Sequence, residues 1–240
     1  MYFLHGIGGN ELNWEQEWRF SGQIRREWAK NNAKRPTVVT LSYGPNWLLA
    51  KKNPSPLSGL FEATTDQVIP MVEGSLGGLK GRRILMGYSM GGFNAIQLAL
   101  NTNLFDKVAL VCAPVTGVSA YAPQEDITKF IESSYAWQYH SNGDPSVVTQ
   151  AVQLMIKVSQ AFFPTPDLWS MVAPLNIVKK TTTKSQFYIT AGIHDRYAIY
   201  EGNIAFVESL KSSSIPVEWH PQWGDHCTMD IPTIADFLVK

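Results

Sequence analysis

A serine between two glycines follows a short apolar run in this chain. Ser89 is the central residue of "GYSMG", the run 84–86 precedes it, and small and apolar residues at helical spacing follow it. This order predicts a strand, a sharp turn and a helix. Such a turn holds a serine hydroxyl clear of the backbone, and side chains on Gly87 or Gly91 would collide with the neighbouring strand and helix. The pattern therefore predicts a serine nucleophile at position 89.

The strand, turn and helix around Ser89 resemble the nucleophile motif of the α/β-hydrolases. A serine hydroxyl needs a base to take its proton, and in these enzymes the acid and then a histidine base follow the serine. That order excludes His5. We expect His226 to be the base, because it follows a predicted strand in a loop that contains Gly224 and precedes the last helix. Of the remaining three histidines, His140 lies in the segment 117–180, His194 lies beside the best acid candidate, and His220 lies within a predicted strand.

The acid that orients the base is expected at the end of a strand between the nucleophile and the base. Asp195 meets this condition, since "SQFYITAGIHDRY" has the pattern of a strand that runs into a turn. Its carboxylate would hold the imidazole through the nitrogen that faces away from the serine and would stabilise the imidazolium. Asp225 is adjacent to His226, but neighbours on a backbone rarely face each other well enough for this contact. Asp167 is the more remote alternative.

Two backbone amides are needed for the oxyanion that forms when the nucleophile attacks. One is expected from Met90, which follows the serine and begins a helix whose dipole favours negative charge. The other is expected from Ile7, because the glycines around it in "HGIGGN" let the main chain approach a substrate closely. These glycines do not complete a dinucleotide-binding fingerprint, and "GGLKG" does not complete a phosphate loop. The chemistry calls for no metal and no other cofactor.

The elements that must position these residues follow from the alternation along the chain. Short apolar and β-branched runs alternate with helical patterns, which predicts a single α/β domain over residues 1–240. We expect a mostly parallel sheet of about six strands with helices on both faces. The predicted strands are 2–5, 37–42, 83–88, 107–112, 185–191 and 216–221. The predicted helices are 16–31, 60–73, 92–102, 201–212 and 230–239.

The segment at about 117–180 interrupts this alternation. It contains five of the fourteen prolines and no predicted strand, but it has two amphipathic helical patterns, one around Ile127 and one that begins at Pro145. Because the segment lies over the edge of the sheet where ligands bind, we expect a helical cap or lid. The alternative is an insertion that only packs on the domain.

Tryptophans are the candidate substrate-binding residues. Trp223 lies three residues before the base and is therefore expected to line the cleft, and Trp137 and Trp169 of the cap are candidates to face it. The alternative for each is packing in the core, which we expect for Trp18 and Trp28 on the first predicted helix.

Composition excludes several other classes of protein. Twenty basic residues balance twenty acidic ones and no basic run exceeds two, so nothing predicts binding to nucleic acid or to an anionic membrane. No apolar stretch is long enough to span a bilayer, and the first residues lack the basic region of a secretory signal. Cys112 and Cys227 lie in different strand regions, so we do not expect them to pair. Unpaired cysteines favour a reducing compartment, although a secreted enzyme without disulfides would have the same pattern.

Beyond the serine motif, four segments resemble the esterase branch of the α/β-hydrolases that includes esterase D, S-formylglutathione hydrolases, and feruloyl and acetyl-xylan esterases. They span the chain except for the cap: "FLHGIGGNELNW", "RRILMGYSMGGFNAIQLALNTNLFDKVAL", "ITAGIHDRY" and "WHPQWGDHCTMDIPTIADFL". The resemblance implies an α/β-hydrolase fold and the same nucleophile, base, acid and oxyanion donors (Ser89, His226, Asp195, Ile7 and Met90). Two features depart from the family pattern. Members usually have extra strands before the His-Gly segment, and their base usually follows two glycines rather than Gly224 and Asp225.

These features predict a serine carboxylesterase that forms an acyl-enzyme and acts on a small-molecule ester. The same residues would serve a thioesterase or a peptidase, and the sequence does not separate these activities. From a different class, the alternative is a non-catalytic binding protein on a hydrolase scaffold. The joint presence of the serine, the aspartate and the histidine argues against it, because binding alone requires none of the three.

Overall fold

The centre of the computed structural model, which describes residues 1–51 and 59–240, is a six-stranded sheet with the strand order β2-β1-β3-β4-β5-β6. All neighbouring strands pair in parallel. The strands confirm the six predicted positions: β1 (Tyr2–Leu4), β2 (Val39–Leu41), β3 (Ile84–Tyr88), β4 (Lys107–Val111), β5 (Gln186–Thr190) and β6 (Val217–Trp219). Since parallel strands are joined by crossover connections, their carboxyl ends all meet at one edge of the sheet.

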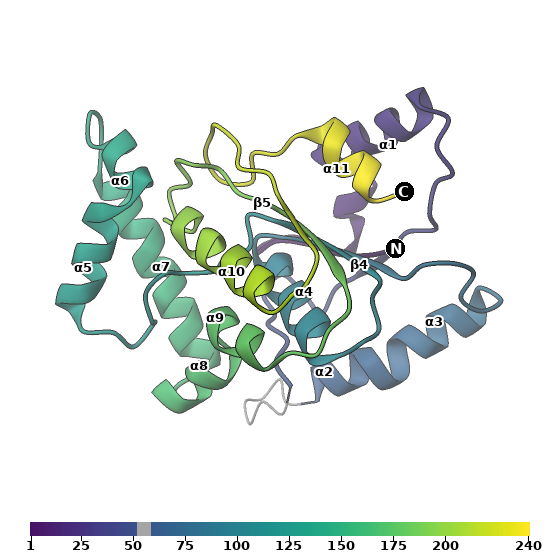
Figure 1. Ribbon diagram of the computed structural model, residues 1–240, viewed down its shortest axis with the longest axis horizontal. Helices are drawn as coiled ribbons and strands as arrows, with labels where there is room; N and C mark the ends of the chain where they lie inside the picture. Colours follow the sequence, from purple (N-terminus) through teal and green to yellow (C-terminus); the bar gives the residue numbers. More distant parts are fainter. Residues whose placement is uncertain (52–58) are drawn as a thin grey trace.

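Helices cover both faces of this sheet, as predicted (Figure 1). One face carries the 3₁₀ helix η1 (Glu11–Trp14), α1 (Phe20–Lys30) and α11 (Ile231–Phe237). The other carries α2 (Leu60–Glu62), the π-helical segment η2 (Ala63–Val68), α3 (Ile69–Ser75), α4 (Met90–Asn101) and α10 (Tyr200–Ser212). In the part of the chain that the structure describes, no helix is both long and apolar enough to cross a membrane.

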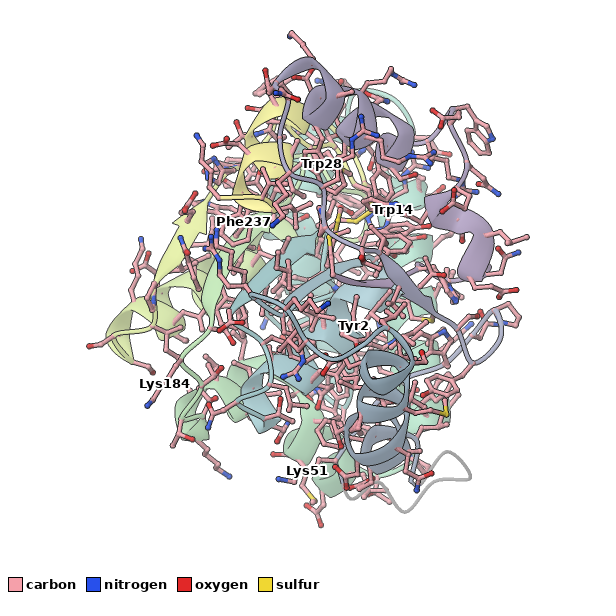
Figure 2. All side chains as sticks on the ribbon, turned by 90° about the vertical axis from the view of Figure 1, so that its right-hand side faces the viewer. Tyr2, Trp14, Trp28, Lys51, Lys184 and Phe237 are labelled. Carbon is pink, nitrogen blue, oxygen red and sulfur yellow. A yellow bond between two sulfur atoms is a disulfide. The ribbon has the colours of Figure 1, made fainter. Side chains whose placement is uncertain are left out.

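Alternate residues of the four inner strands, β1, β3, β4 and β5, pack into two separate apolar cores. In β5, Phe187 and Ile189 face α4 and α10, whereas Tyr188 faces α1 and α11. This alternation follows from the pleat of a strand, whose successive side chains point to opposite faces. On the second face, Trp28 donates from Nε1 to the carbonyl of Ala235 at 2.7 Å and so joins α1 to α11. Figure 2 shows Trp28 there with Trp14 and Phe237.

Between β4 and β5 the chain forms helices that extend beyond one end of the sheet (Figure 1). They are α5 (Gln124–Ser133), α6 (Tyr135–His140), α7 (Ser146–Phe162), α8 (Pro166–Val172), α9 (Pro174–Ile177) and the 3₁₀ turn η3 (Val178–Lys180). The sequence predicted two of these helices. The short α8 and α9 were missed because their prolines suggest breaks, yet Pro166 and Pro174 stand in first turns, where a helix needs no amide donor.

Glycine at position 202 lets α10 lie close to the chain that leaves β4. A Cβ there would collide with the carbonyl of Val115, whereas a Cβ on Gly74 in α3 would meet no atom within 4 Å. We predict that Gly202→Ala lowers the free energy of unfolding by about 1–3 kcal/mol through overpacking. The control Gly74→Ala should raise it by about 0.5–1 kcal/mol through helix propensity. Thermal unfolding measures both changes, and equal midpoints would contradict the close packing at α10.

Candidate active site

Ser89 lies in the turn between β3 and α4, at the carboxyl edge of the sheet. Its backbone has φ 52° and ψ −126°, a conformation that residues other than glycine rarely adopt. A Cβ on Gly87 would collide with the carbonyl of Gly91, and one on Gly91 would collide with the carbonyl of Leu4 in β1. The two glycines therefore let the turn pack against its own helix and the neighbouring strand. The amide of Ser89 donates to the carbonyl of Val111 in β4 at 2.9 Å.

The predicted nucleophile, base and acid lie together in one hydrogen-bonded chain. Nε2 of His226 is 3.0 Å from Oγ of Ser89, and Nδ1 of His226 is 2.7 Å from Oδ2 of Asp195. The Asp195 side chain is fully buried, and its Oδ1 accepts the amide of Tyr197 at 3.0 Å. A carboxylate at Nδ1 favours the tautomer with the proton on that nitrogen, which leaves Nε2 free to accept a proton from the serine.

The other histidines and the remote aspartate have different surroundings. Asp167 is exposed in the first turn of α8. His5 is fully buried, and its Nε2 lies 2.9 Å from Oγ of Ser42 and 3.1 Å from Nε1 of Trp47. The rings of His140 and His194 pack against an aromatic residue of the segment 117–180. The ring of His220 packs against an aromatic residue of β5.

Asp225, the chain neighbour of the base, pairs with Arg196 and does not reach the imidazole. Its Oδ2 accepts from Nε of Arg196 at 2.8 Å and also from Nη2. Its Oδ1 accepts the amides of Arg196 at 3.0 Å and of His226 at 2.7 Å. Burial alone would raise the pKa of Asp225, but the hydrogen bonds from Arg196 and from these amides outweigh it and lower the pKa. The carboxylate is therefore ionised, with its charge already balanced by a guanidinium.

Ile7 and Met90 line the same cavity as Ser89 and His226. Met90 is the first residue of α4, so its amide has no partner within the helix and is free to bind an oxyanion. Apolar side chains from the main body of the fold form one wall of the cavity: Leu48, Phe93, Pro114 and Ile199. Residues of α7 and α8 also line the cavity: Leu154, Met155, Val158 and Trp169.

Trp223 lies outside this cavity, contrary to the expectation that it lines the cleft. It is 75% exposed, and its ring packs edge-on against His194 with a centroid distance of 4.3 Å. The reason is the backbone pairing of Gln222 with Gly192, which places this part of the loop beside the turn that carries His194. Of the two cap tryptophans, Trp169 lines the cavity, whereas Trp137 packs in an apolar cluster with α5 and α7.

Cys112 and Cys227 form a disulfide, so the expectation that they stay unpaired was wrong. Their Cα atoms are 4.8 Å apart, although 115 positions separate them in the chain. Cys112 directly follows β4 and Cys227 directly follows His226, and the parallel sheet brings these two points to the same edge. The sequence contained one signal for this pairing, because each cysteine follows the end of a strand. The argument for a reducing compartment loses its basis, because structural disulfides persist in oxidising environments.

Within the described residues, potential metal ligands cluster at Cys112, His226 and Cys227, whose ligand atoms lie within 4.8 Å of one another. The two sulfurs are bonded to each other. Both ring nitrogens of His226 already face Ser89 and Asp195. The ligand atoms of this cluster are therefore already engaged with one another or with the side chains of Ser89 and Asp195.

Comparisons with known proteins agree with the fold. Residues 1–169 match the model of a family described as "Putative esterase". The structure is similar to an S-formylglutathione hydrolase from Agrobacterium tumefaciens, with a TM-score of 0.62 and 17% identity over 98% of this chain and 79% of that one. It is also similar to carboxyl esterase 2 from Tuber melanosporum, with a TM-score of 0.61 and 15% identity over 99% and 72% of the two chains. A ferulic acid esterase gives a TM-score of 0.56 and 16% identity over 99% and 81%.

No curated protein matches the sequence. The structural likenesses, at these identities, establish the α/β-hydrolase fold, and the family match extends over well more than half of the chain. The chain therefore belongs to the esterase family of the α/β-hydrolases and is a carboxylic ester hydrolase.

Proposed function

We propose that this esterase hydrolyses small carboxylic esters through an acyl-enzyme on Ser89, with His226 as the base and Asp195 as the acid that orients it. The observation that supports this most strongly is the hydrogen-bonded chain of these three side chains beside an apolar cavity. A protein that only bound its ligand would need no serine in a strained turn and no buried carboxylate behind an imidazole.

Acylation begins when Oγ of Ser89 attacks the ester carbonyl carbon while Nε2 of His226 takes the hydroxyl proton. The amides of Ile7 and Met90 hold the oxyanion of the tetrahedral intermediate. The bond to the alcohol oxygen then breaks, and the alcohol leaves with the proton from His226. The buried carboxylate of Asp195 stabilises the imidazolium between these two proton transfers.

Deacylation repeats the sequence with water in place of the serine. His226 takes a proton from the water, and the resulting hydroxide attacks the acyl carbon. The second tetrahedral intermediate collapses, the carboxylic acid leaves, and Ser89 recovers its proton from His226. Neither half of the cycle consumes a cofactor, so the side chains and amides named above suffice.

The segment 117–180 acts in this proposal as a cap that shapes the substrate cavity. Helix α7 contributes Leu154 and Val158, and α8 contributes Trp169. Among the described residues that line the cavity, none is Asp, Glu, Lys or Arg. A largely apolar wall favours an ester whose acyl or alcohol part is an uncharged alkyl or aryl group.

Replacing the nucleophile tests the mechanism. Ser89→Ala should fold normally and lower kcat on an activated ester by about four to six orders of magnitude, because the hydroxyl that forms the acyl intermediate is gone. A fluorophosphonate probe should label the natural protein and leave the variant unlabelled. Substantial turnover by the folded variant would overturn the mechanism. The same assay with a matched thioester and a matched amide separates an esterase from a thioesterase or a peptidase.

The two aspartates near the base should respond differently to the same substitution. Asp195→Asn keeps the shape but favours the wrong imidazole tautomer, and we predict a fall in kcat of about 10⁴, the loss known for serine proteases. Asp225→Asn should cost less than about tenfold, because that carboxylate contacts the backbone of His226 and not its ring. The measurement is kcat for both variants, with folding checked by circular dichroism. The reverse ranking would assign the acid to Asp225, and two mild effects would argue for Asp167 or for no acid.

The cap proposal is tested with two exposed apolar residues of similar size. Leu154 lines the cavity and is 52% exposed, whereas Met171 on α8 is 58% exposed and does not line it. Leu154→Ala should shift the ratio of kcat/KM between a long and a short acyl ester by about tenfold, which corresponds to one lost apolar contact. Met171→Ala should leave the ratio unchanged. A flat ranking in both variants would remove the support for a cap that sets specificity.

A further inference from the structure

The loop that carries His226 has no helix or strand of its own between β6 and α11. Its first part is held by backbone hydrogen bonds to the chain after β5: the amide of Gln222 donates to Ala191 at 3.0 Å, and the amide of His194 donates to Gly224 at 3.0 Å. These bonds end one residue before Asp225. The position of the imidazole therefore depends on its own hydrogen bond to Asp195 and on what holds the two chain neighbours of His226.

The neighbour on the amino side is held by the ion pair of Asp225 with Arg196. Arg196 directly follows Asp195, so this contact connects the loop of the base to the turn of the acid. The same carboxylate accepts the amide of His226, which fixes the backbone of the base as well. This contact thus connects the backbone at His226 to the turn that carries Asp195.

The neighbour on the carboxyl side is held by the disulfide of Cys227 with Cys112. Cys112 directly follows Val111, whose carbonyl accepts the amide of Ser89 at 2.9 Å. The amide of Cys112 donates to the carbonyl of Thr190 in β5 at 2.8 Å. Cys112 is therefore held by the sheet, and it is fully buried. This covalent link connects the loop of the base to the strand end that supports the nucleophile.

Both cysteines lie in a backbone conformation that favours glycine. Cys112 has φ 45° and Cys227 has φ 63°. Glycine would adopt these angles more easily, but it has no side chain to form a cross-link. A residue held in such a conformation persists only where the surrounding structure enforces it, and such positions concentrate at functional sites.

We propose that the Cys112–Cys227 disulfide positions the base: with the Arg196–Asp225 pair, it holds His226 between the nucleophile and the acid. This inference rests on the proposed function, in which His226 transfers the proton. Neither cysteine lines the substrate cavity, so the link acts on the rate of the chemical step and leaves substrate binding alone.

The cross-link also makes the geometry of the base sensitive to reduction. A dithiol such as dithiothreitol supplies two electrons and two protons. The sulfur–sulfur bond breaks, Cys112 and Cys227 become thiols, and the dithiol closes to a cyclic disulfide. With the bond broken, hydrogen bonds remain as the links of this loop, among them those from Thr228 to the carbonyl of Asp225 and from the imidazole to Asp195. The distance from Nε2 to the serine is then held less tightly.

The test is the double variant Cys112→Ala/Cys227→Ala, which should lower kcat on an activated ester by about tenfold to hundredfold, since small misplacements of reacting groups cost this much. Its KM should stay within about twofold. Reduction should lower the kcat of the natural protein to that of the double variant, and reoxidation should restore the original kcat. Neither treatment should change the kcat of the double variant. Adding Asp225→Asn to the double variant should cost more than the product of the separate effects, because the ion pair and the disulfide that hold the two chain neighbours of His226 are then both lost.

Glu73→Gln is the control for a loss of stability alone. Glu73 pairs with Arg83 at 2.7 Å, near the amino end of β3 and far from the carboxyl edge. This variant should lower the midpoint of thermal unfolding and leave kcat unchanged. If the cysteine variant behaves in the same way, or if its KM rises at constant kcat, the positioning role is overturned.

A measurement independent of turnover separates this proposal from the proposed function. The Nδ1 proton of His226, identified by its loss in Asp195→Asn, should give a sharp low-field NMR signal in the natural protein and a broadened or missing one in the double variant. Fluorophosphonate labelling of the natural protein tests the esterase mechanism separately. An unlabelled protein whose signal depends on the disulfide would refute the mechanism and keep the positioning role. A labelled protein with an unchanged signal and kcat would refute the positioning role alone.

Discussion

The close approach of three backbone segments at Ser89 is the constraint on which the site depends. Strand β1, the end of β3 and the start of α4 lie so near one another that no side chain fits on Gly87 or Gly91. The left-handed backbone of Ser89 costs about 1–3 kcal/mol, and the packed sheet and helix around it supply that energy. In return, one turn places the serine side chain and the first residue of α4, Met90, beside the same cavity.

The parallel sheet then explains why distant residues meet at this turn. Ser89 follows β3, Asp195 follows β5, and His226 follows β6, so all three lie beyond carboxyl ends of strands that run in one direction. This much could be predicted from the sequence, because the signals are local. Six apolar runs, glycines at a turn and the order of serine, aspartate and histidine each involve a few neighbouring residues. Local signals suffice when the fold itself brings the strand ends together.

The disulfide and the place of Trp223 could not be predicted in this way, because both depend on the path of loops. Chain proximity to His226 suggested that Trp223 lines the cleft, but the bridge between Gly192 and Gln222 extends the sheet by one position and places the indole beside His194. The two cysteines looked separate because they belong to different strand regions. Only the strand order, with β4 and β5 adjacent, shows that a loop after β6 can return to the end of β4.

Two aspartates contact His226, one at its ring and one at its backbone, and their surroundings differ. The charge of Asp225 is balanced by Arg196, and its Oδ1 is occupied by two backbone amides, so it has little left to offer a proton on the ring. Asp195 is buried, accepts one amide on Oδ1 and directs Oδ2 at Nδ1 of His226. A buried carboxylate is stabilised most when the side chain that it contacts becomes positively charged, because few other groups screen the attraction between them. The aspartate that is remote in sequence is thus suited to stabilise the imidazolium, and the adjacent one is suited to hold the backbone.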